Sequence, residues 1–145
     1  MLITPFITKY RLTTLALALG LFAVAANVQA ETPQDFLNTY KAEAKAADPA
    51  FQDFSATRGE AFFKATHGNE WSCASCHTSK PTNAGQHAKT NKLIEPLAPA
   101  TNPERFTNAR KVEKWFKRNC KDVLDRECTA LEKGDVLTFL TLLKP

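Results

Sequence analysis

Methionine is almost absent from this 145-residue chain, since Met1 is the only one, and there are only three histidines. Neither charge sign dominates either: 19 basic and 15 acidic side chains give a formal net charge of +4. With 43% hydrophobic and 23% charged residues, the composition excludes a disordered polyelectrolyte and a membrane protein with several spans. We therefore expect one small globular domain.

The one long apolar run lies at the N-terminus. Residues 12–26 carry no charge, follow two basic side chains and are too short for a typical membrane span. Small residues occupy the signal peptidase recognition positions before a cut after Ala30. The sequence thus predicts a signal peptide at 1–30 and an exported domain at 31–145, with an uncleaved anchor as the alternative. The domain's net charge of +2 is too small to indicate nucleic acid binding.

Helical periodicity dominates the exported part. Apolar residues recur at helical spacing in four stretches, 33–47, 56–67, 109–119 and 130–144. No strand pattern competes, and residues 78–102 are expected to form a long loop, which in a small domain usually has a function. The sequence predicts an all-α fold of four to five short helices. A core this small often depends on a cofactor or a crosslink.

The sequence C-x-x-C-H at residues 73–77 is the attachment motif for c-type haem. Two thiols at this spacing can form thioethers with the two vinyl groups of one porphyrin, and the adjacent imidazole then lies beneath the iron. We predict one covalent haem c, attached through Cys73 and Cys76, with His77 as the proximal ligand.

Other uses of paired cysteines fit the sequence less well. A thioredoxin-like dithiol needs a βαβ setting, which the helical pattern lacks. A structural zinc site needs a second ligand pair, and Cys120 and Cys128 are eight residues apart. A helix with Gly59 and Phe63 before the motif, together with a C-terminal apolar helix, is the arrangement of class I cytochromes c. In that fold the two helices cross at the glycine.

The distal ligand cannot be the methionine of most electron-transfer cytochromes c, because Met1 leaves with the signal peptide. His67 and His87 each lie ten residues from His77, and ten extended residues reach up to roughly 33 Å. However, His67 is also typical of a helix C-terminus and His87 of a solvated loop. The distal position is therefore a histidine, another polar residue or open.

Asn119 is a further candidate for the distal position. It shares a predicted helix face with Val112, Trp115 and Phe116, and it lies 42 residues beyond His77. A buried amide there needs a hydrogen-bonding group. Asparagine is also common at helix C-termini, so periodicity alone leaves both interpretations open.

Several segments closely resemble the sphaeroides haem protein family of oxygen-binding monohaem cytochromes c. They are residues 95–99, 103–107, 112–120 and 125–129. The resemblance covers nearly all of the exported chain and implies that Asn119 is the distal ligand. It also implies a disulfide between Cys120 and Cys128, which an exported protein permits. The family's electron donors, a dihaem cytochrome c and a membrane cytochrome b, are implied as partners.

The expected function is that of a periplasmic, monomeric haem protein whose ferric iron is capped by the amide oxygen of Asn119. An amide oxygen is a hard donor that suits Fe(III) better than Fe(II), so reduction should release it and allow O₂, NO or CO to bind. Trp115 and Phe116 would line the ligand pocket. The alternatives are a six-coordinate electron carrier with His67 or His87, and an enzyme that reduces oxygen or nitrogen oxides, for which no proton donor is identified.

Overall fold

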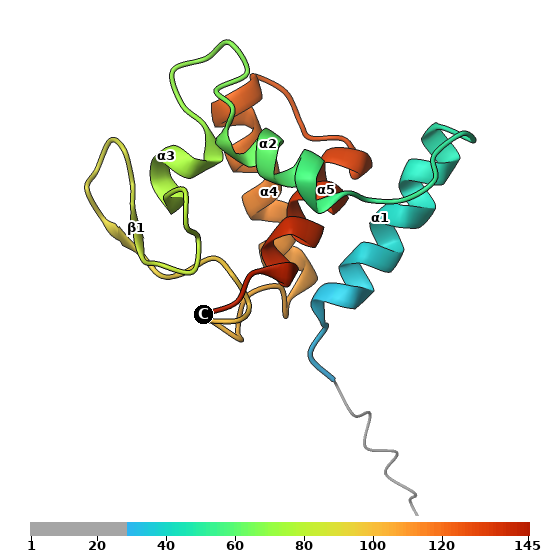
Figure 1. Cartoon of the computed structure of the whole chain (residues 1–145), viewed down its shortest axis with the longest axis horizontal. Coiled ribbons are helices and arrows are strands. Elements are labelled where there is room, and N and C mark those ends of the chain that lie inside the picture. The colour runs from blue at the N-terminus through green and yellow to red at the C-terminus, as the bar shows by residue number, and fades with distance from the viewer. Residues whose placement is uncertain (1–28) are drawn as a thin grey trace, which may run out of the picture.

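The computed structural model describes residues 29–145, and most of the regular structure in them is helical (Figure 1). The helices are α1 (Pro33–Ala47), α2 (Ala56–Lys64), α3 (Cys73–His77), α4 (Ala109–Leu124) and α5 (Ala130–Leu142). A small antiparallel sheet of β1 (Gly85–Gln86) and β2 (Leu93–Ile94) lies between α3 and α4 in the chain. The predicted helical class is confirmed. None of the helices described is long and apolar enough to cross a membrane.

The helix starts follow from capping residues that the sequence contains. Thr32 and Asp35 form a capping box at α1, and Thr129 and Glu132 form another at α5. In each box the side chain of the first residue accepts a hydrogen bond from the backbone N–H of the second, whose carboxylate accepts one in return. Both helices therefore begin where the periodicity predicts them, at Pro33 and Ala130.

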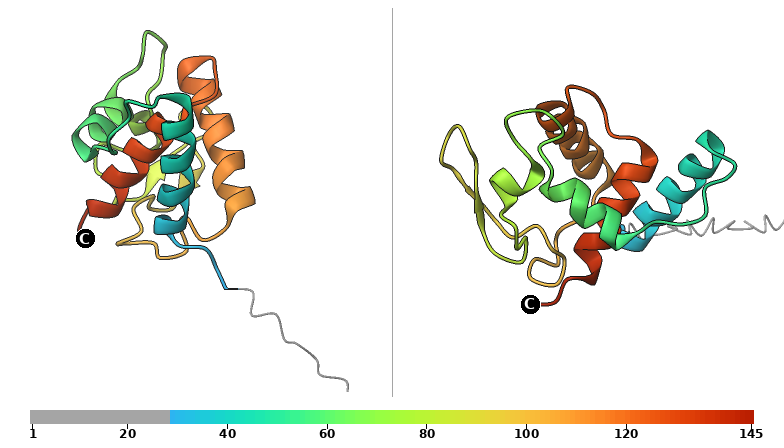
Figure 2. Two further views of the ribbon diagram at one scale, coloured as in Figure 1. Left: turned by 90° about the vertical axis from the view of Figure 1, so that its right-hand side faces the viewer. Right: turned by 45° about the horizontal axis from the view of Figure 1, so that its top comes forward.

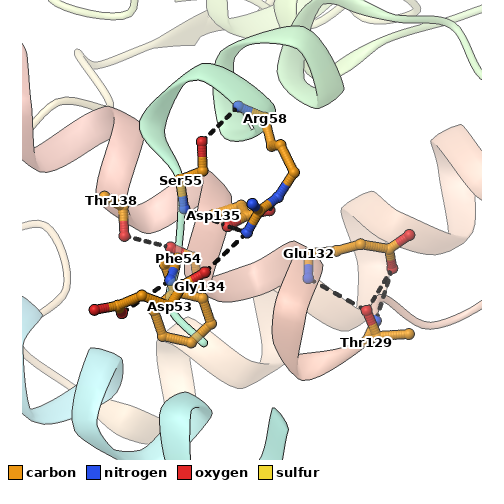
Figure 3. A network of polar contacts seen from close by, with 9 residues as sticks. All are labelled: Asp53, Phe54, Ser55, Arg58, Thr129, Glu132, Gly134, Asp135 and Thr138. Carbon is orange, nitrogen blue, oxygen red and sulfur yellow. Dashed lines mark hydrogen bonds and ion pairs between the residues drawn. The ribbon is translucent and has the colours of Figure 1, made fainter. Parts of the chain in front are cut away.

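Helices α2 and α5 cross at Gly59, as the class I pattern predicts. A Cβ atom at this position would overlap the backbone carbonyl of Asp135 in α5, so only glycine allows the approach. The buried Asp135 carboxylate accepts hydrogen bonds from the Ser55 N–H at 2.6 Å and from Arg58 Nε at 2.7 Å (Figure 3). This charged and hydrogen-bonded pair fixes α2 on α5 beside the glycine.

Gly59→Ala is expected to destabilise the domain by about 2–3 kcal/mol, because the added methyl group must push two helix backbones apart. Denaturant unfolding of the haem-loaded protein measures the loss. Gly68→Ala measures the cost of backbone strain alone, since Gly68 has a φ of 87° but no atom near its Cβ position. A Gly59→Ala variant as stable as the parent protein would contradict close packing as the reason for Gly59.

Three helix ends differ from the prediction, and α5 differs least, since it ends at Leu142 instead of residue 144. Helix α2 ends at Lys64 instead of residue 67, because Ala65 is extended and the His67 imidazole turns back to the Phe62 carbonyl at 2.9 Å. Helix α4 continues beyond Asn119 to Leu124, where Asp125 adopts a left-handed cap with φ 58°.

The region expected to be an irregular loop contains the two short strands. Gly85 pairs with Ile94 and Gln86 with Leu93, so residues 85–94 form a hairpin. Strands of two residues show no alternating pattern that a sequence could reveal. In Figure 1 the hairpin projects beside α3, on the side of the molecule away from α1.

Two clusters of buried side chains make up the core. One cluster joins α1, α4 and α5 through Phe36, Tyr40, Val112 and Leu137. The other joins α2 and α5 through Phe63, Val136, Phe139 and Leu140. Phe106 and Phe116 pack against both clusters, so Phe116 connects the middle of α4 to the whole core.

Candidate functional site

The short helix α3 presents the two cysteines of the C-x-x-C-H motif. Ser72 caps this helix through a reciprocal pair of hydrogen bonds with Ser75. Cys73 and Cys76 are three residues apart and therefore lie on one side of the helix. Both are free thiols and both are half-buried. Burial raises the pKa of the Cys73 thiol to about 11, which is unlike the low-pKa thiolate of a dithiol redox catalyst.

His77 ends α3 and is held in its neutral form. Burial, and to a smaller extent the nearby positive charge of Arg105, lower the pKa of His77 to about 4. The neutral imidazole is the form that binds a metal ion. Its ring centre lies 6.4 Å from that of Phe63 in the core.

An apolar surface adjoins the motif. Cys73 and Ala74 pack against the cluster that contains Phe63 and Phe139, and Leu97, Phe106 and Phe116 pack against the same cluster. A covalently bound haem requires two unpaired thiols on one helix face, a neutral imidazole and an adjoining apolar surface. The residues of this region therefore fit a c-type haem.

The hairpin contacts the C-x-x-C-H motif, and the sequence does not predict this contact. Gly85 lies so near the backbone carbonyl of Cys76 that a Cβ atom would overlap it. The Ala88 N–H donates a hydrogen bond to Cys76 Sγ at 3.4 Å. The one sequence signal for the close approach of Gly85 to Cys76 was a glycine within a segment that shows no helical or strand periodicity.

Arg105 is a site residue that sequence periodicity also missed. Its guanidinium is half-buried and donates to the carbonyl oxygens of Pro96 at 2.8 Å and Glu95 at 2.6 Å. Desolvation lowers the pKa of Arg105, but the group remains charged near His77. It therefore fixes the loop before α4 and supplies a positive charge beside the proximal histidine.

Asn119 lies on α4 at the edge of the buried surface. The buried positions of this helix are Val112, Cys120 and Val123, with Phe116 half-buried between them. Asn119 is half-buried, and its side chain makes no hydrogen bond within residues 29–145, where no fully buried side-chain polar atom lacks one. It lies three residues from Phe116, close to one helical turn, and Phe116 contacts the cluster against which Cys73 also packs.

The predicted common face of Val112, Trp115, Phe116 and Asn119 is wrong in one respect. Trp115 is 49% exposed, and its ring lies 5.1 Å from the Arg118 guanidinium. The buried stripe of α4 runs through 112, 116, 120 and 123, so positions 115 and 119 form a neighbouring line.

The two histidines considered as distal ligands both have local contacts. His67 is exposed, its ring packs on Phe62 with the centres 4.4 Å apart, and its Nε2 contacts the Phe62 carbonyl. His87 lies at the exposed turn of the hairpin, where Nδ1 accepts from the N–H groups of Lys89 and Thr90 at 3.2 and 3.4 Å. These contacts agree with the helix-end and loop interpretations of the two residues.

Helix α4 is tied to the rest of the domain at both ends. Near its start, Glu113 accepts hydrogen bonds from Tyr40 in α1 at 2.5 Å and from Lys133 in α5 at 2.6 Å. Burial and the Glu113 carboxylate raise the pKa of Tyr40 far above its ordinary value, so the hydroxyl stays a donor. The right-hand view of Figure 2 shows α5 between α1 and α4.

At the other end of α4, Cys120 and Cys128 form a disulfide with their Cα atoms 5.6 Å apart. Asn69, in the loop before α3, donates from Nδ2 to the Val123 carbonyl at 2.9 Å. The disulfide lies next to Asn119 in the chain and joins α4 to the start of α5. The position of Asn119 is therefore fixed from both directions.

If Cys73 and Cys76 hold the haem, the haem-loaded protein is expected to contain one disulfide and no free thiol. Intact-mass measurement after alkylation, with and without reduction, counts the thiols. Reduction should expose two alkylation sites and lower the free energy of unfolding by about 2–3 kcal/mol. Alkylation of two cysteines without reduction would show that the disulfide is absent. It would then not fix the position of Asn119.

The chain matches a family model, individual proteins and solved structures. The DUF1924 family model, described as a domain of unknown function, matches residues 49–140. Cytochrome c'' of Methylophilus methylotrophus is 37% identical over 124 residues, 83% of this chain and 86% of that protein. The cytochrome c-type protein SHP of Cereibacter sphaeroides is 45% identical over 102 residues, 68% of this chain and 75% of that protein.

Solved structures show the same likeness. Oxidised SHP, described as an oxygen-binding cytochrome c, superimposes with a TM-score of 0.70 at 39% identity, over 79% of this chain and 99% of that one. The crystal structure of oxidised cytochrome c'' gives 0.70 at 37% identity, over 78% and 95%. A solution structure of cytochrome c'', described in terms of haem-ligand detachment, gives 0.68 at 37% identity, over 78% and 94%.

Proposed function

Because the chain belongs to the DUF1924 family of c-type cytochromes, with SHP and cytochrome c'', and carries one haem, we propose that Asn119 is a redox-dependent distal ligand. In this proposal Asn119 occupies the distal side of the iron in the ferric state and leaves it in the ferrous state. The protein then binds a small diatomic molecule at the freed position.

Cys73 and Cys76 would hold the haem through thioethers, and His77 would be the proximal ligand. The haem supplies an iron that takes up one electron and, once ferrous, accepts a ligand such as O₂. The neutral state of His77 and the apolar cluster beside Cys73 support these assignments.

The observation that carries the proposal is the contrast between Asn119 and the two histidines. Asn119 is half-buried and its amide is free among residues 29–145, whereas His67 and His87 are exposed and have contacts of their own. A free amide at the edge of a core is available to a ligand. SHP is described as an oxygen-binding cytochrome c and cytochrome c'' in terms of haem-ligand detachment, and both descriptions support the same interpretation.

The contacts that hold α4 at both ends limit how Asn119 would move. Glu113 is held by Tyr40 and Lys133, and Cys120 is held by the disulfide. With the backbone fixed on both sides, rotation of the side chain is the simplest way for the amide to leave the iron. The released amide N–H₂ group can then donate a hydrogen bond to a bound diatomic ligand.

We further propose that residues 1–30 are removed as a signal peptide and that 31–145 act in the periplasm. The disulfide supports this location, because disulfides persist in oxidising compartments. A dihaem cytochrome c and a membrane cytochrome b are the proposed electron donors, and a monomer is the proposed state.

The ferrous absorption spectrum, recorded with and without CO, tests the proposal. A released Asn119 leaves an open site, so we expect a high-spin ferrous spectrum that CO converts to a low-spin one. Sharp α and β bands that CO does not change would instead indicate a permanent sixth ligand. That result would favour an electron carrier that uses His67 or His87.

A further inference from the structure

The hairpin over the haem-attachment motif has features of a docking element. Figure 1 shows it at the outer edge of the domain, beside α3 and opposite α1. Gly85 is buried against the Cys76 carbonyl and pairs with Ile94. Since side chains alternate along a strand, Leu93 points to the outer face, and it is 71% exposed. It is the most exposed of the large apolar side chains among residues 29–145.

Positive charge gathers around this apolar residue. Residues 71–94 contain Lys80, Lys89 and Lys92 and no acidic side chain, although the whole exported chain has a net charge of only +2. None of the three lysines takes part in an ion pair within the described residues. Lys89 lies over the Trp71 ring at 4.4 Å, which holds its charge beside the hairpin.

The hairpin also has a direct contact with the attachment motif. The Ala88 N–H donates to Cys76 Sγ, which under the proposed function is the sulfur of one thioether. A molecule seated on the outer face of the hairpin is therefore separated from that sulfur by little more than one layer of backbone. Short routes of bonded and hydrogen-bonded atoms are what electron transfer into a buried cofactor requires.

We propose that the outer face of residues 85–94, with Lys80, Lys89, Lys92 and Leu93, is the docking surface for an acidic electron-transfer protein. The proposal rests on the proposed haem attachment through Cys76. The lysines attract and orient the acidic surface, and Leu93 supplies an apolar contact at the centre. Each encounter passes one electron from the donor to ferric iron, so the donor is oxidised by one electron and no atom is transferred.

Binding can be measured without electron transfer by using oxidised flavodoxin, a strongly acidic redox protein, as the probe. Titration of the ferric haem-loaded protein should shift the backbone amide resonances of Ala88, Lys89 and Leu93 before those of α1. Lys89→Gln/Lys92→Gln should weaken binding about fivefold at low ionic strength, and the difference should disappear in high salt because the charges are then screened. Leu93→Ser should weaken binding at both ionic strengths.

The control is Lys41→Gln/Lys45→Gln, which removes the same charge from the exposed face of α1 and also removes the ion pair of Lys41 with Asp53. It should change binding less than about 1.5-fold, because α1 lies on the side of the molecule away from the hairpin and charges far from a docking surface are screened by salt. With flavodoxin hydroquinone, which is oxidised to the semiquinone, the reduction rates of the variants should follow the same order.

Two results would overturn the proposal. One is an equal effect of both double variants, which would show a general charge effect. The other is a set of resonance shifts centred on α4, whose lysines would then form the docking surface. Neither result depends on Asn119, and the ferrous spectrum with CO reports on Asn119 without any protein partner. Failure of the docking proposal and failure of the proposed function are therefore distinguishable.

Discussion

Cys73→Ser and Cys76→Ser are each expected to lower the yield of folded, haem-bearing protein by about tenfold or more. A domain of this size has little stability to lose, and a loss of about 1.4 kcal/mol already lowers the ratio of folded to unfolded protein about tenfold. A porphyrin attached at Cys73 would add buried apolar area beside the cluster that Cys73 contacts. Haem staining and absorbance of periplasmic extracts measure the yield.

Ser75→Ala is the control for these variants, because Ser75 lies between the two cysteines and only takes part in the Ser72 cap. Its loss should cost about 1 kcal/mol and leave haem attachment intact. Recovery of a stable, cooperatively unfolding Cys73→Ser protein without haem, at normal yield, would contradict the dependence of the core on the cofactor.

Asn119→Ala is expected to change the ferric protein and to leave the ferrous protein nearly unaltered. Without the amide oxygen, water or hydroxide replaces it, so the ferric spin state shifts. If Asn119 occupies the iron about 99% of the time, its removal speeds the entry of azide or imidazole about 100-fold. Stopped-flow absorbance of the ferric protein measures this rate.

Asn108→Ala supplies the comparison on the same helix. Asn108 caps α4 by accepting a hydrogen bond from the Lys111 N–H at 3.0 Å, and its loss should cost about 1 kcal/mol without a spectral change. If Asn119→Ala behaved like Asn108→Ala, with an unchanged ferric spectrum and unchanged azide entry, Asn119 would be an ordinary helix residue.

Much of the fold follows from local patterns that the sequence displays openly. Capping boxes set the starts of α1 and α5, and Gly59 fixes the crossing of α2 with α5. The end of α4 was less predictable, because Asn119 looks like a helix end while the buried positions continue to Val123. The hairpin depends on the approach of Gly85 to Cys76, a tertiary contact without a local signature.

One part of the candidate site can likewise be predicted from the sequence, and the other part cannot. The C-x-x-C-H motif is a compact signal, and it indicates Cys73, Cys76 and His77 directly. Spacing alone left Asn119 undecided between ligand and cap, and the resemblance to a family was needed to choose. Arg105 beside His77 and the Tyr40 contact with Glu113 join residues far apart in the chain, so no periodicity could reveal them.

The most direct measurement is a pair of crystal structures of the haem-loaded protein, one in the ferric state and one after reduction of the same crystals. We expect Asn119 Oδ1 to be bonded to iron in the ferric structure and to be withdrawn from it in the ferrous structure. The same sixth ligand in both states, or the imidazole of His67 or His87 on the distal side, would contradict a redox-dependent Asn119 ligand.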